Sequence, residues 1–444
     1  MCFCYNGFAY NQKLIIIIKR TMKTLLKNAR ILKMTDENIV IGNLLIEDDR
    51  IAYIGENVDN LGPFDKEIDC QGNILMPGFK NAHTHSAMSF LRSKTDDHSL
   101  QDWLFNVVLP REELLQENDV YEMAKISFLE YLTSGITACF DQYYSPLESA
   151  KAAREMGMRI VLLGTYNKNV DLVKRYHEIN DQNDLVRYCL GVHAEYTLGE
   201  GELEEVVEAC HQLKAPFYAH ISETKKEVKE CIAKRGMTPV AYFEKMGAFD
   251  YGGGGYHCCY FTDEDIDIFK KHNCSVVTCP GSNSKLASGV APICKYLDRG
   301  LNVAIGTDGP ASNNSLDMFK EMTLVYAFQK VTLKDPTALP AIEILKMATV
   351  NGAKAMGLTD CDILEVGKKA DIIEIDLHRP NMQPLNNIVN NIVYSGSKEN
   401  VKMTIINGKI LYREGKFFID EPIEDIYRKV KEIGDRIEGE LAGK

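Results

Sequence analysis

His83 and His85, two histidines separated by one residue, end an apolar stretch that the sequence predicts to be a strand. Side chains at positions i and i+2 of a strand point to the same side, so both imidazoles can reach one point. This geometry suits a metal ion. Surface or packed histidines show the same spacing, so the pair carries weight only where further ligands accompany it.

Further reactive side chains stand at the ends of predicted strands. Five of the ten histidines are placed in this way: His83, His85, His193, His220 and His257. Each of these histidines alone is equally well explained as a packed core residue. Core packing does not readily explain why five of them lie at the same end of parallel strands. Asp308 follows the last strand and adds a carboxylate. The first two histidines, His220 and Asp308 would provide a shell of nitrogen and oxygen ligands with room for water, as catalytic zinc requires. Zinc lowers the pKa of such a water from 15.7 to about 7.

Glu223 lies three residues after His220, on the loop that follows the strand. There it can exchange protons between the water and a substrate nitrogen, a role that contributes about 10²–10⁴-fold in rate. The alternative is a helix N-terminal charge preceding Lys225 and Lys226. His257 is placed to polarise or position the same water.

The segment that carries these residues alternates between apolar runs of strand length and helical stretches, which is typical of a parallel α/β fold. One helix is predicted over residues 202–210, where Leu203, Val206, Val207 and Cys210 form an apolar stripe. With the strand before His83, the predicted strands number eight: 135–140, 159–163, 188–192, 216–219, 255–256, 274–278 and 303–306 follow it. Eight strand–helix units over roughly 250 residues predict a (β/α)8 barrel, in which chemistry lies at the C-terminal strand ends.

Both ends of the chain read as short strands separated by turn residues. We expect residues 22–77 and 361–420 to form the two parts of one β-sandwich domain, and residues 78–360 to form the barrel. Residues 421–444 are predicted to form a C-terminal helix. Residues 1–21 are interpreted as a disordered or added extension, because their apolar run of five residues is too short for a signal sequence.

Composition narrows the class of partner. The 444-residue chain has a net charge of −12, which disfavours nonspecific binding to nucleic acid or to anionic lipid. Beyond the extension, no apolar stretch approaches the length that spans a bilayer. The thirteen cysteines are scattered without a repeated spacing, which indicates reduced thiols in a cytoplasmic protein. A small neutral or cationic substrate remains open.

Seven motifs together make a specific pattern, at residues 77–85, 102–110, 192–197, 220–224, 257–258, 280–286 and 306–314. Over about residues 23–420 the chain resembles the amidohydrolase superfamily. Within it, the chain is most similar to the deaminases acting on 5′-methylthioadenosine and S-adenosylhomocysteine, with related chlorohydrolases. The resemblance implies a distorted (β/α)8 TIM barrel of the α/β class, carrying a composite β-sandwich from both chain ends.

By position, the resemblance implies one divalent metal ion, Zn²⁺ with Fe²⁺ or Mn²⁺ as alternatives. Its implied ligands are His83, His85, His220 and Asp308. Glu223 would protonate the ring nitrogen beside the attacked carbon, His257 would stabilise the attacking hydroxide, and Asp308 would accept the water proton. Binuclear relatives also use a carbamylated lysine on the fourth strand, which residues 191–195 do not offer.

The resemblance also implies contacts with a small heterocyclic substrate. His193 would contact the purine, and Glu112 falls where ribose hydroxyls bind. Trp103 would form an apolar wall, although a core role explains it equally well. Glu223 and Asp308 complete these contacts. A homo-oligomer is expected by resemblance only.

Two departures from the family pattern affect the substrate. Residues 162–166 lack the arginine that relatives carry after the third strand, which weakens the case for a substrate carboxylate such as that of S-adenosylhomocysteine. Glu195 replaces a proline. An extra acid at the pocket rim would favour a substrate with a positive or hydrogen-bond-donating group.

With this resemblance, the sequence predicts a metal-dependent aminohydrolase. It would release ammonia from a purine nucleoside such as 5′-methylthioadenosine, S-adenosylhomocysteine or adenosine, or from a related heterocycle. One alternative is a hydrolase of another heterocycle, such as guanine, a pterin or a halogenated triazine. The other is a barrel that has lost catalysis and serves as a scaffold. Metal analysis separates the scaffold from the enzymes, because a scaffold need hold no stoichiometric metal.

Overall fold

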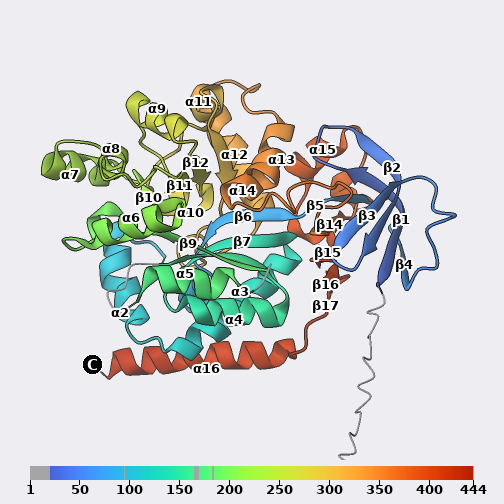
Figure 1. The fold of residues 1–444 in the computed structure, drawn as a ribbon, viewed down its shortest axis with the longest axis horizontal. Coiled ribbons are helices and arrows are strands. Elements are labelled where there is room, and N and C mark those ends of the chain that lie inside the picture. Colours follow the sequence, from blue (N-terminus) through green and yellow to red (C-terminus); the bar gives the residue numbers. More distant parts are fainter. Residues whose placement is uncertain (1–20, 95, 165–169, 183–184, 444) are drawn as a thin grey trace, which may run out of the picture.

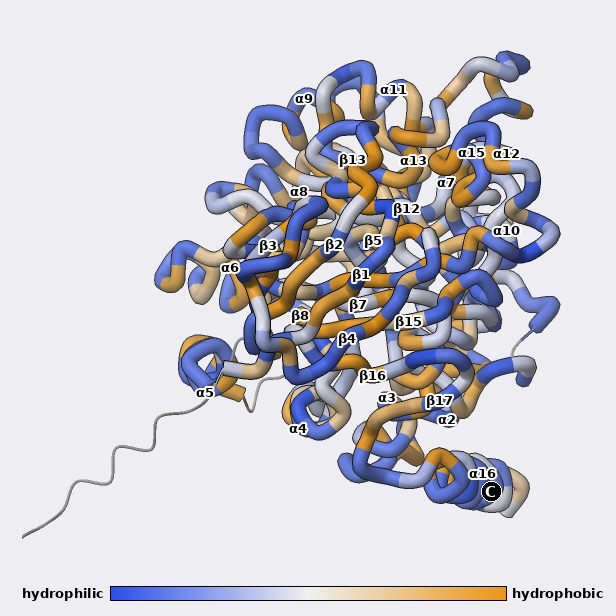
Figure 2. Tube along the Cα trace, turned by 90° about the vertical axis from the view of Figure 1, so that its right-hand side faces the viewer, coloured by the Kyte–Doolittle hydropathy of each residue, from blue (hydrophilic) through white to orange (hydrophobic). Residues whose placement is uncertain are grey.

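The computed structural model describes residues 21–94, 96–164, 170–182 and 185–443 (Figure 1). The predicted N-terminal extension, apart from its last residue, lies outside these ranges. Two sheets organise the described chain, one of eight strands and one of nine. Figure 2 shows hydrophobic strands in the middle of the molecule, with hydrophilic turns around them.

The eight-stranded sheet is the barrel, and its strands pair in parallel in chain order. They are β6 (Phe79–Thr84), β7 (Ile136–Gln142), β8 (Arg159–Gly164), β9 (Val186–Gly191), β10 (Phe217–Ile221), β11 (Gly253–His257), β12 (Ser275–Thr278) and β13 (Asn302–Ile305). All eight predicted strands are present. The two edges, β6 and β13, are joined by hydrogen bonds from Asn81 Nδ2 to Thr307 Oγ1 (2.7 Å) and from the Asp308 amide to the His83 carbonyl (3.0 Å).

Helices cover the outside of the barrel (Figure 1). In α6 the predicted stripe of Leu203, Val206, Val207 and Cys210 is buried. The helices after the strands are α3 (Glu117–Thr133), α4 (Pro146–Met156), α5 (Leu172–Asn180), α6 (Glu202–Leu213), α7 (Lys225–Arg235), α8 (Pro239–Lys245), α9 (Asp263–Lys271), α10 (Pro280–Lys285), α11 (Ile293–Asp298), α12 (Met318–Leu333), α13 (Ala341–Ala348) and α14 (Val350–Ala355).

The barrel interior is filled beneath the mouth. One buried cluster takes residues from nearly every strand, among them Ala82, Phe140, Tyr218, Tyr256 and Val277. The Tyr256 ring stacks on the imidazole at position 83 with 3.8 Å between ring centroids. The barrel interior is therefore a packed core beneath the mouth, as the fold class predicts.

The nine-stranded sheet joins the two ends of the chain. Its order is β17-β16-β15-β14-β5-β1-β2-β3, with β4 also pairing with β1, so the antiparallel contact between β5 and β14 connects the segments. The strands are β1 (Lys23–Leu32), β2 (Ile39–Glu47), β3 (Arg50–Gly55), β4 (Lys66–Asp69), β5 (Ile74–Pro77), β14 (Ile372–Ile375), β15 (Val401–Ile406), β16 (Lys409–Arg413) and β17 (Lys416–Phe417). This sheet surrounds its own hydrophobic cluster. The predicted fold class, a barrel with a composite β-domain from both chain ends, is confirmed.

The remaining elements are short, except for the last helix. That helix, α16 (Ile423–Ala442), runs along the barrel beside α3 and α2 (Figure 1). The short elements are η1 (Ser86–Leu91), α1 (Leu100–Asp102), η2 (Trp103–Val108), α2 (Leu109–Glu112), η3 (Glu195–Thr197), η4 (Pro380–Met382), α15 (Ile388–Asn390), η5 (Asn391–Ser395) and η6 (Lys398–Asn400). Among the described residues, every helix is too short or too polar to cross a bilayer.

Candidate active site

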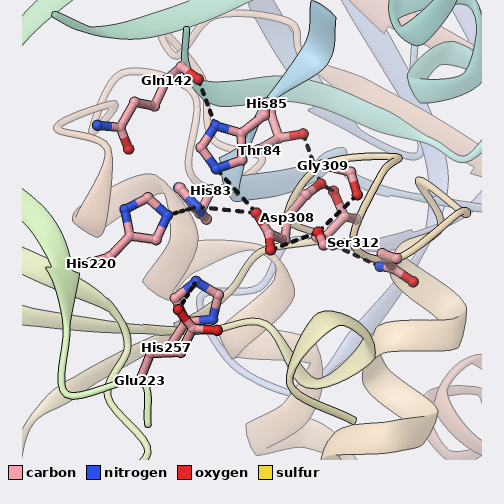
Figure 3. Close-up of polar contacts among 12 residues, drawn as sticks. His83, Thr84, His85, Gln142, His220, Glu223, His257, Asp308, Gly309 and Ser312 are labelled. Atoms are coloured by element: carbon pink, nitrogen blue, oxygen red, sulfur yellow. Dashed lines mark hydrogen bonds and ion pairs between the residues drawn. The ribbon is translucent and has the colours of Figure 1, made fainter. Parts of the chain in front are cut away.

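Imidazoles converge on one carboxylate at the mouth of the barrel (Figure 3). His83 Nε2 lies 3.1 Å from His220 Nε2 and 3.4 Å from Asp308 Oδ1, and His85 Nε2 lies 3.2 Å from the same oxygen. Two ligand atoms bound tetrahedrally to zinc at 2.0–2.1 Å lie about 3.3 Å apart. The spacing of these four side chains therefore fits a single small cation.

The outer atoms of three of these ligands, His85, His220 and Asp308, are held by hydrogen bonds. The Nδ1 atom of His85 contacts the Gln142 carbonyl (2.6 Å), and that of His220 contacts the His193 carbonyl (2.9 Å). Because each Nδ1 is used in this way, each Nε2 is left to face the centre. Asp308 Oδ2 accepts a hydrogen bond from Ser312 Oγ (2.8 Å), which turns Oδ1 toward the imidazoles.

Burial and hydrogen bonds together control the charge of the cluster. Burial lowers the pKa of His83 to about 3 and that of His193 to about 4, and it holds the pKa of His220 well below its usual value. Burial also opposes protonation of His85, but the hydrogen bond to Asp308 raises its pKa overall. For Asp308, burial is outweighed by the hydrogen bonds from His83 and His85, so its pKa is well below normal. The shifts of His83, His220 and Asp308 therefore favour neutral imidazoles and an ionised carboxylate, the forms that bind a divalent metal.

His257 lies at the same centre. One ligand atom from each of four buried residues lies within 4.8 Å of the others: His83, His220, His257 and Asp308. His257 Nδ1 contacts Asn283 Oδ1 (2.7 Å), and its Nε2 lies 3.9 Å from Glu223 Oε2. It therefore stands between the carboxylate of Glu223 and the other imidazoles, as a group that orients water would. His85 is outside this set of four but touches the carboxylate that the set shares.

Left-handed backbone at three strand ends directs these side chains. Ser222, His257 and Asp308 have φ values of 53°, 66° and 58°. Such a conformation in a non-glycine residue costs of order 1–3 kcal/mol and is concentrated at functional sites. Here it turns the chain sharply where β10, β11 and β13 end.

Glu223 is buried and held in a fixed loop. Its Oε1 accepts a hydrogen bond from Ser288 Oγ (2.8 Å). The backbone amides of Ser222 and Glu223 donate to the carboxylate of Glu227, at 2.6 and 2.7 Å. Glu227 also forms the capping box of α7 with Thr224. Glu227 therefore provides the negative charge at the N-terminus of α7, so that role is not needed to explain Glu223.

A cavity of about 890 Å³ opens above the cluster. Its lining includes the five predicted substrate contacts: Trp103, Glu112, His193, Glu223 and Asp308. Burial raises the pKa of Glu112 to about 7, even though the hydrogen bond from Tyr143 OH to Glu112 Oε1 (2.6 Å) lowers it. All the predicted site residues except His83 thus line one pocket, and His83 lies buried next to His220 and Asp308. Their roles remain predictions.

The pocket also contains residues that the sequence reasoning missed: Tyr143, Tyr144, Arg175, Tyr196 and Glu202. The two tyrosines directly follow β7, which extends two residues beyond its predicted end. A search of strand ends for aromatic residues would have found them. Arg175 lies within helix α5, where position in the sequence gives no such signal.

One of the two expectations drawn from the departures is corrected. Glu195 is buried, with 3% of its surface exposed, and its Oε2 lies 3.0 Å from Arg235 Nε. The Arg235 guanidinium in turn stacks over the Tyr242 ring at 3.8 Å. Glu195 therefore ties η3 to α7 and offers no charge at the rim. Residues 162–166, of which 165 and 166 lie outside the described residues, contain no arginine, but Arg175 of α5 lines the pocket.

A buried glutamate links two loops of the site. Glu321 accepts hydrogen bonds from the Gly281 amide and from Asn313 Nδ2, both at 2.8 Å. The first belongs to α10, whose Asn283 orients the imidazole at position 257. The second belongs to the loop after β13. Burial raises the pKa of Glu321 to about 7.

This raised pKa predicts a measurable pH dependence of stability. The folded state holds the Glu321 proton up to about pH 7, whereas the unfolded chain releases it near pH 4.5. The contribution of Glu321 protonation to the free energy of unfolding is fully present below pH 4.5 and is lost as the pH rises through 7. The loss is about 3 kcal/mol, since one pKa unit corresponds to about 1.36 kcal/mol. Urea denaturation at pH 5 and pH 8 should show wild type losing more stability than Glu321→Gln. The exposed control Glu264→Gln should follow wild type, and parallel curves for wild type and Glu321→Gln would contradict the assignment.

Comparison with known proteins agrees with this geometry. A deaminase of Thermoanaerobacter pseudethanolicus named for 5-methylthioadenosine and S-adenosylhomocysteine is 41% identical, over 88% of this chain and 94% of its own. A 5′-deoxyadenosine deaminase of Methanothermobacter thermautotrophicus is 38% identical, over 90% of this chain and 95% of its own.

A solved structure and a family model extend the comparison. The crystal structure of an adenosine deaminase from Xanthomonas campestris with bound zinc superposes with a TM-score of 0.88 at 28% identity, covering 94% of this chain and 99% of that one. Residues 74–411, from β5 to the end strands of the composite sheet, match the sequence model of the amidohydrolase family. With its barrel, its strand-end histidines and these relatives, the chain belongs to the amidohydrolase family.

Proposed function

We propose that this chain is a divalent-metal-dependent aminohydrolase, which replaces the exocyclic amino group of a purine nucleoside by oxygen and releases ammonia. The observation that carries the proposal is the position of Glu223 and His257 in the same pocket as Asp308, with 3.9 Å between Glu223 Oε2 and His257 Nε2. A proton carrier and a water-orienting imidazole beside a convergent ligand set are what hydrolytic deamination needs. The deaminase names of two relatives support the same reaction.

The proposed metal ligands are His83, His85, His220 and Asp308. Zn²⁺ is proposed because of the nitrogen-rich ligand set and the zinc in the Xanthomonas campestris relative, with Fe²⁺ and Mn²⁺ as alternatives. When bound, such an ion supplies a Lewis acid that makes water nucleophilic near neutral pH.

The protein side chains would then move the protons. His257 Nε2 orients the water against the carbon that bears the amino group, and Asp308 takes the first proton of the water. Glu223 protonates the ring nitrogen beside that carbon, so the ring can accept the new carbon–oxygen bond. The carbon–nitrogen bond breaks as Asp308 passes its proton to the departing amino group, which leaves as ammonia. The remaining hydroxyl proton returns to Glu223, and the product is the oxo heterocycle.

The rest of the pocket is suited to a nucleoside with a long 5′ substituent. A cavity of about 890 Å³ is larger than a purine requires. Glu112 is proposed to bind ribose hydroxyls, with Trp103 as an apolar wall. Arg175 and Glu202, of opposite charge, also line the pocket and could pair with the carboxylate and ammonium of the S-adenosylhomocysteine tail.

An ammonia-release screen tests the proposal. We expect purified protein to release ammonia from 5′-methylthioadenosine, S-adenosylhomocysteine, 5′-deoxyadenosine or adenosine, and little from guanine or pterins. Halogenated triazines should yield no chloride. Arg175→Met should lower kcat/KM for S-adenosylhomocysteine about tenfold or more, since a charge-assisted hydrogen bond contributes about 1.5–3 kcal/mol, and should spare 5′-methylthioadenosine. Release from guanine or chloride from triazines alone would refute the proposal.

A cytoplasmic location and a homo-oligomeric assembly are also proposed. The cysteines that the structure describes are free thiols, which supports the cytoplasm, where thiols stay reduced. A homo-oligomer is proposed from the resemblance alone, and sedimentation of the purified protein would measure it.

A further inference from the structure

One wall of the pocket is built from short, irregular elements. The segment from η1 to α2 supplies seven lining residues: Met88, Leu100, Trp103, Leu104, Phe105, Leu109 and Glu112. It contains a six-residue π-helix, η2, between two single-turn helices. Helices this short are not stable by themselves in water, so packing against other elements must hold the wall in place.

The C-terminal helix supplies part of that packing. In α16 the apolar residues Ile426, Val430, Ile433, Ile437 and Leu441 recur every three or four positions and form one stripe. The side chain at position 437 is fully buried in a hydrophobic cluster that also contains residues 88, 103, 104 and 108 of the pocket wall. The far end of the chain therefore completes the cluster behind the pocket.

Ion pairs join the same helix to the wall. The Glu438 carboxylate receives two bonds from Arg111, Nε to Oε1 at 3.0 Å and Nη2 to Oε2 at 3.3 Å, and it pairs with Lys94 at 3.0 Å. The same guanidinium donates from Nη1 to the Val107 carbonyl in η2 at 3.0 Å. A bidentate pair fixes a guanidinium more tightly than a single contact does. Glu438 thus holds Arg111, which is bound to the carbonyl of Val107 in η2 and directly precedes Glu112.

We infer that α16 is a positioning element of the substrate pocket: Glu438, acting through Arg111, fixes the wall that presents Trp103 and Glu112 to the nucleoside. The expected effect on KM rests on the proposed function. The claim that Glu438 holds the wall in place does not depend on catalytic activity. The proposed metal ligands lie on or after β6, β10 and β13, and His85, His220 and Asp308 are held by hydrogen bonds that do not involve Glu438 or Arg111. Loosening the wall should therefore weaken substrate binding and spare the chemistry.

Kinetics give the first test. Glu438→Ala is expected to raise KM for the best nucleoside at least fivefold, with kcat within twofold of wild type and the metal content unchanged. Glu438→Asp, which keeps the charge, should restore most of the wild-type KM. The matched control is Glu432→Ala, because Glu432 is exposed on the same helix and pairs with Arg428 alone among the contacts described. It should match wild type. An unchanged KM in Glu438→Ala, or an equal loss of kcat and metal, would overturn the inference.

Fluorescence gives a second test that needs no turnover. Trp103 is the only tryptophan in the chain, and 6% of its surface is exposed. Tryptophan fluorescence of the protein therefore reports only on the pocket wall that contains Trp103. Glu438→Ala should at least double the acrylamide quenching constant, Glu438→Asp should reverse most of the change, and Glu432→Ala should show none. Far-UV circular dichroism should be the same for all four proteins.

The two tests separate this inference from the proposed function. If wild type releases no ammonia from any purine nucleoside, the proposed function fails, and the Trp103 quenching still decides whether α16 positions the wall. If wild type is active but neither KM nor quenching responds to Glu438→Ala, the inference fails and the proposed function stands.

Discussion

Glutamine in place of Glu223 is expected to lower kcat for ammonia release by at least about 100-fold, because the amide cannot carry a proton to the ring nitrogen. The amide is nearly the same size and can still accept the hydrogen bond from Ser288 Oγ, which holds Oε1 at 2.8 Å. The loop, held through Glu227, should keep its place, so metal content and KM should change little. Steady-state kinetics with metal analysis on the same preparation measure both quantities.

The control for this prediction lies seven residues further along the chain. Glu230 is exposed on α7, and Glu230→Gln should be indistinguishable from wild type. A Glu223→Gln protein with wild-type kcat would rule out the proton-carrier role. One that had lost its metal would instead assign Glu223 to the ligand shell.

Asp308→Ala should have an even larger effect. It removes the one carboxylate that the imidazoles of His83 and His85 share, at 3.4 and 3.2 Å. We expect metal affinity to fall by more than about 100-fold, beyond the 10–100-fold typical of losing a residue that only supports a ligand, and activity to fall below detection. Dialysis against graded chelator, followed by elemental analysis, measures the affinity.

Ser312→Ala is the matched control for that loss. It removes the hydrogen bonds from Ser312 Oγ to Asp308 Oδ2 (2.8 Å) and to the Gly309 carbonyl (3.1 Å), and it leaves the ligand oxygen in place. Metal affinity should fall 10–100-fold, the range for second-sphere partners, with partial activity after metal is added back. Stoichiometric metal and full activity in Asp308→Ala would contradict the proposed ligand set.

The same chelator series decides between His85 and His257 as the remaining ligand. The His85→Ala protein should lose metal as Asp308→Ala does, because its Nε2 touches the shared oxygen. The His257→Ala protein should retain metal and lose turnover, because its Nε2 faces Glu223 and its Nδ1 is held by Asn283.

The strand-end positions were predictable because the barrel repeats one local pattern. Each parallel strand reads as a short apolar run, and chain order fixes neighbour order, so His220 and Asp308 could be brought to His83 without knowing any long-range contact. The ends of strands were less certain. Placing the end of β7 at residue 140 hid the two tyrosines that follow residue 142.

Contacts made by helix faces could not be predicted in the same way. Glu195 and Arg235 are 40 residues apart and lie in different elements, so nothing in the local sequence indicates that they pair. Arg175 reaches the pocket from the middle of α5, where an arginine is equally typical of a solvent-exposed face. The ion pair between Arg111 and Glu438 joins positions 327 residues apart. Such contacts depend on how helices are seated, which periodicity alone does not determine.

The contact between β5 and β14 has a consequence for how the chain reaches its native state. Strand β5 lies in the middle of its sheet and needs residues 372–375 for one of its two edges, and Asn73 needs Glu374, 301 residues away, for a buried hydrogen bond. During synthesis from the N-terminus that edge stays unpaired until most of the polypeptide has left the ribosome. Long-range pairing of this kind slows folding, and an unpaired edge invites association with other nascent chains. From this topology we expect the nascent chain to depend on chaperones during translation.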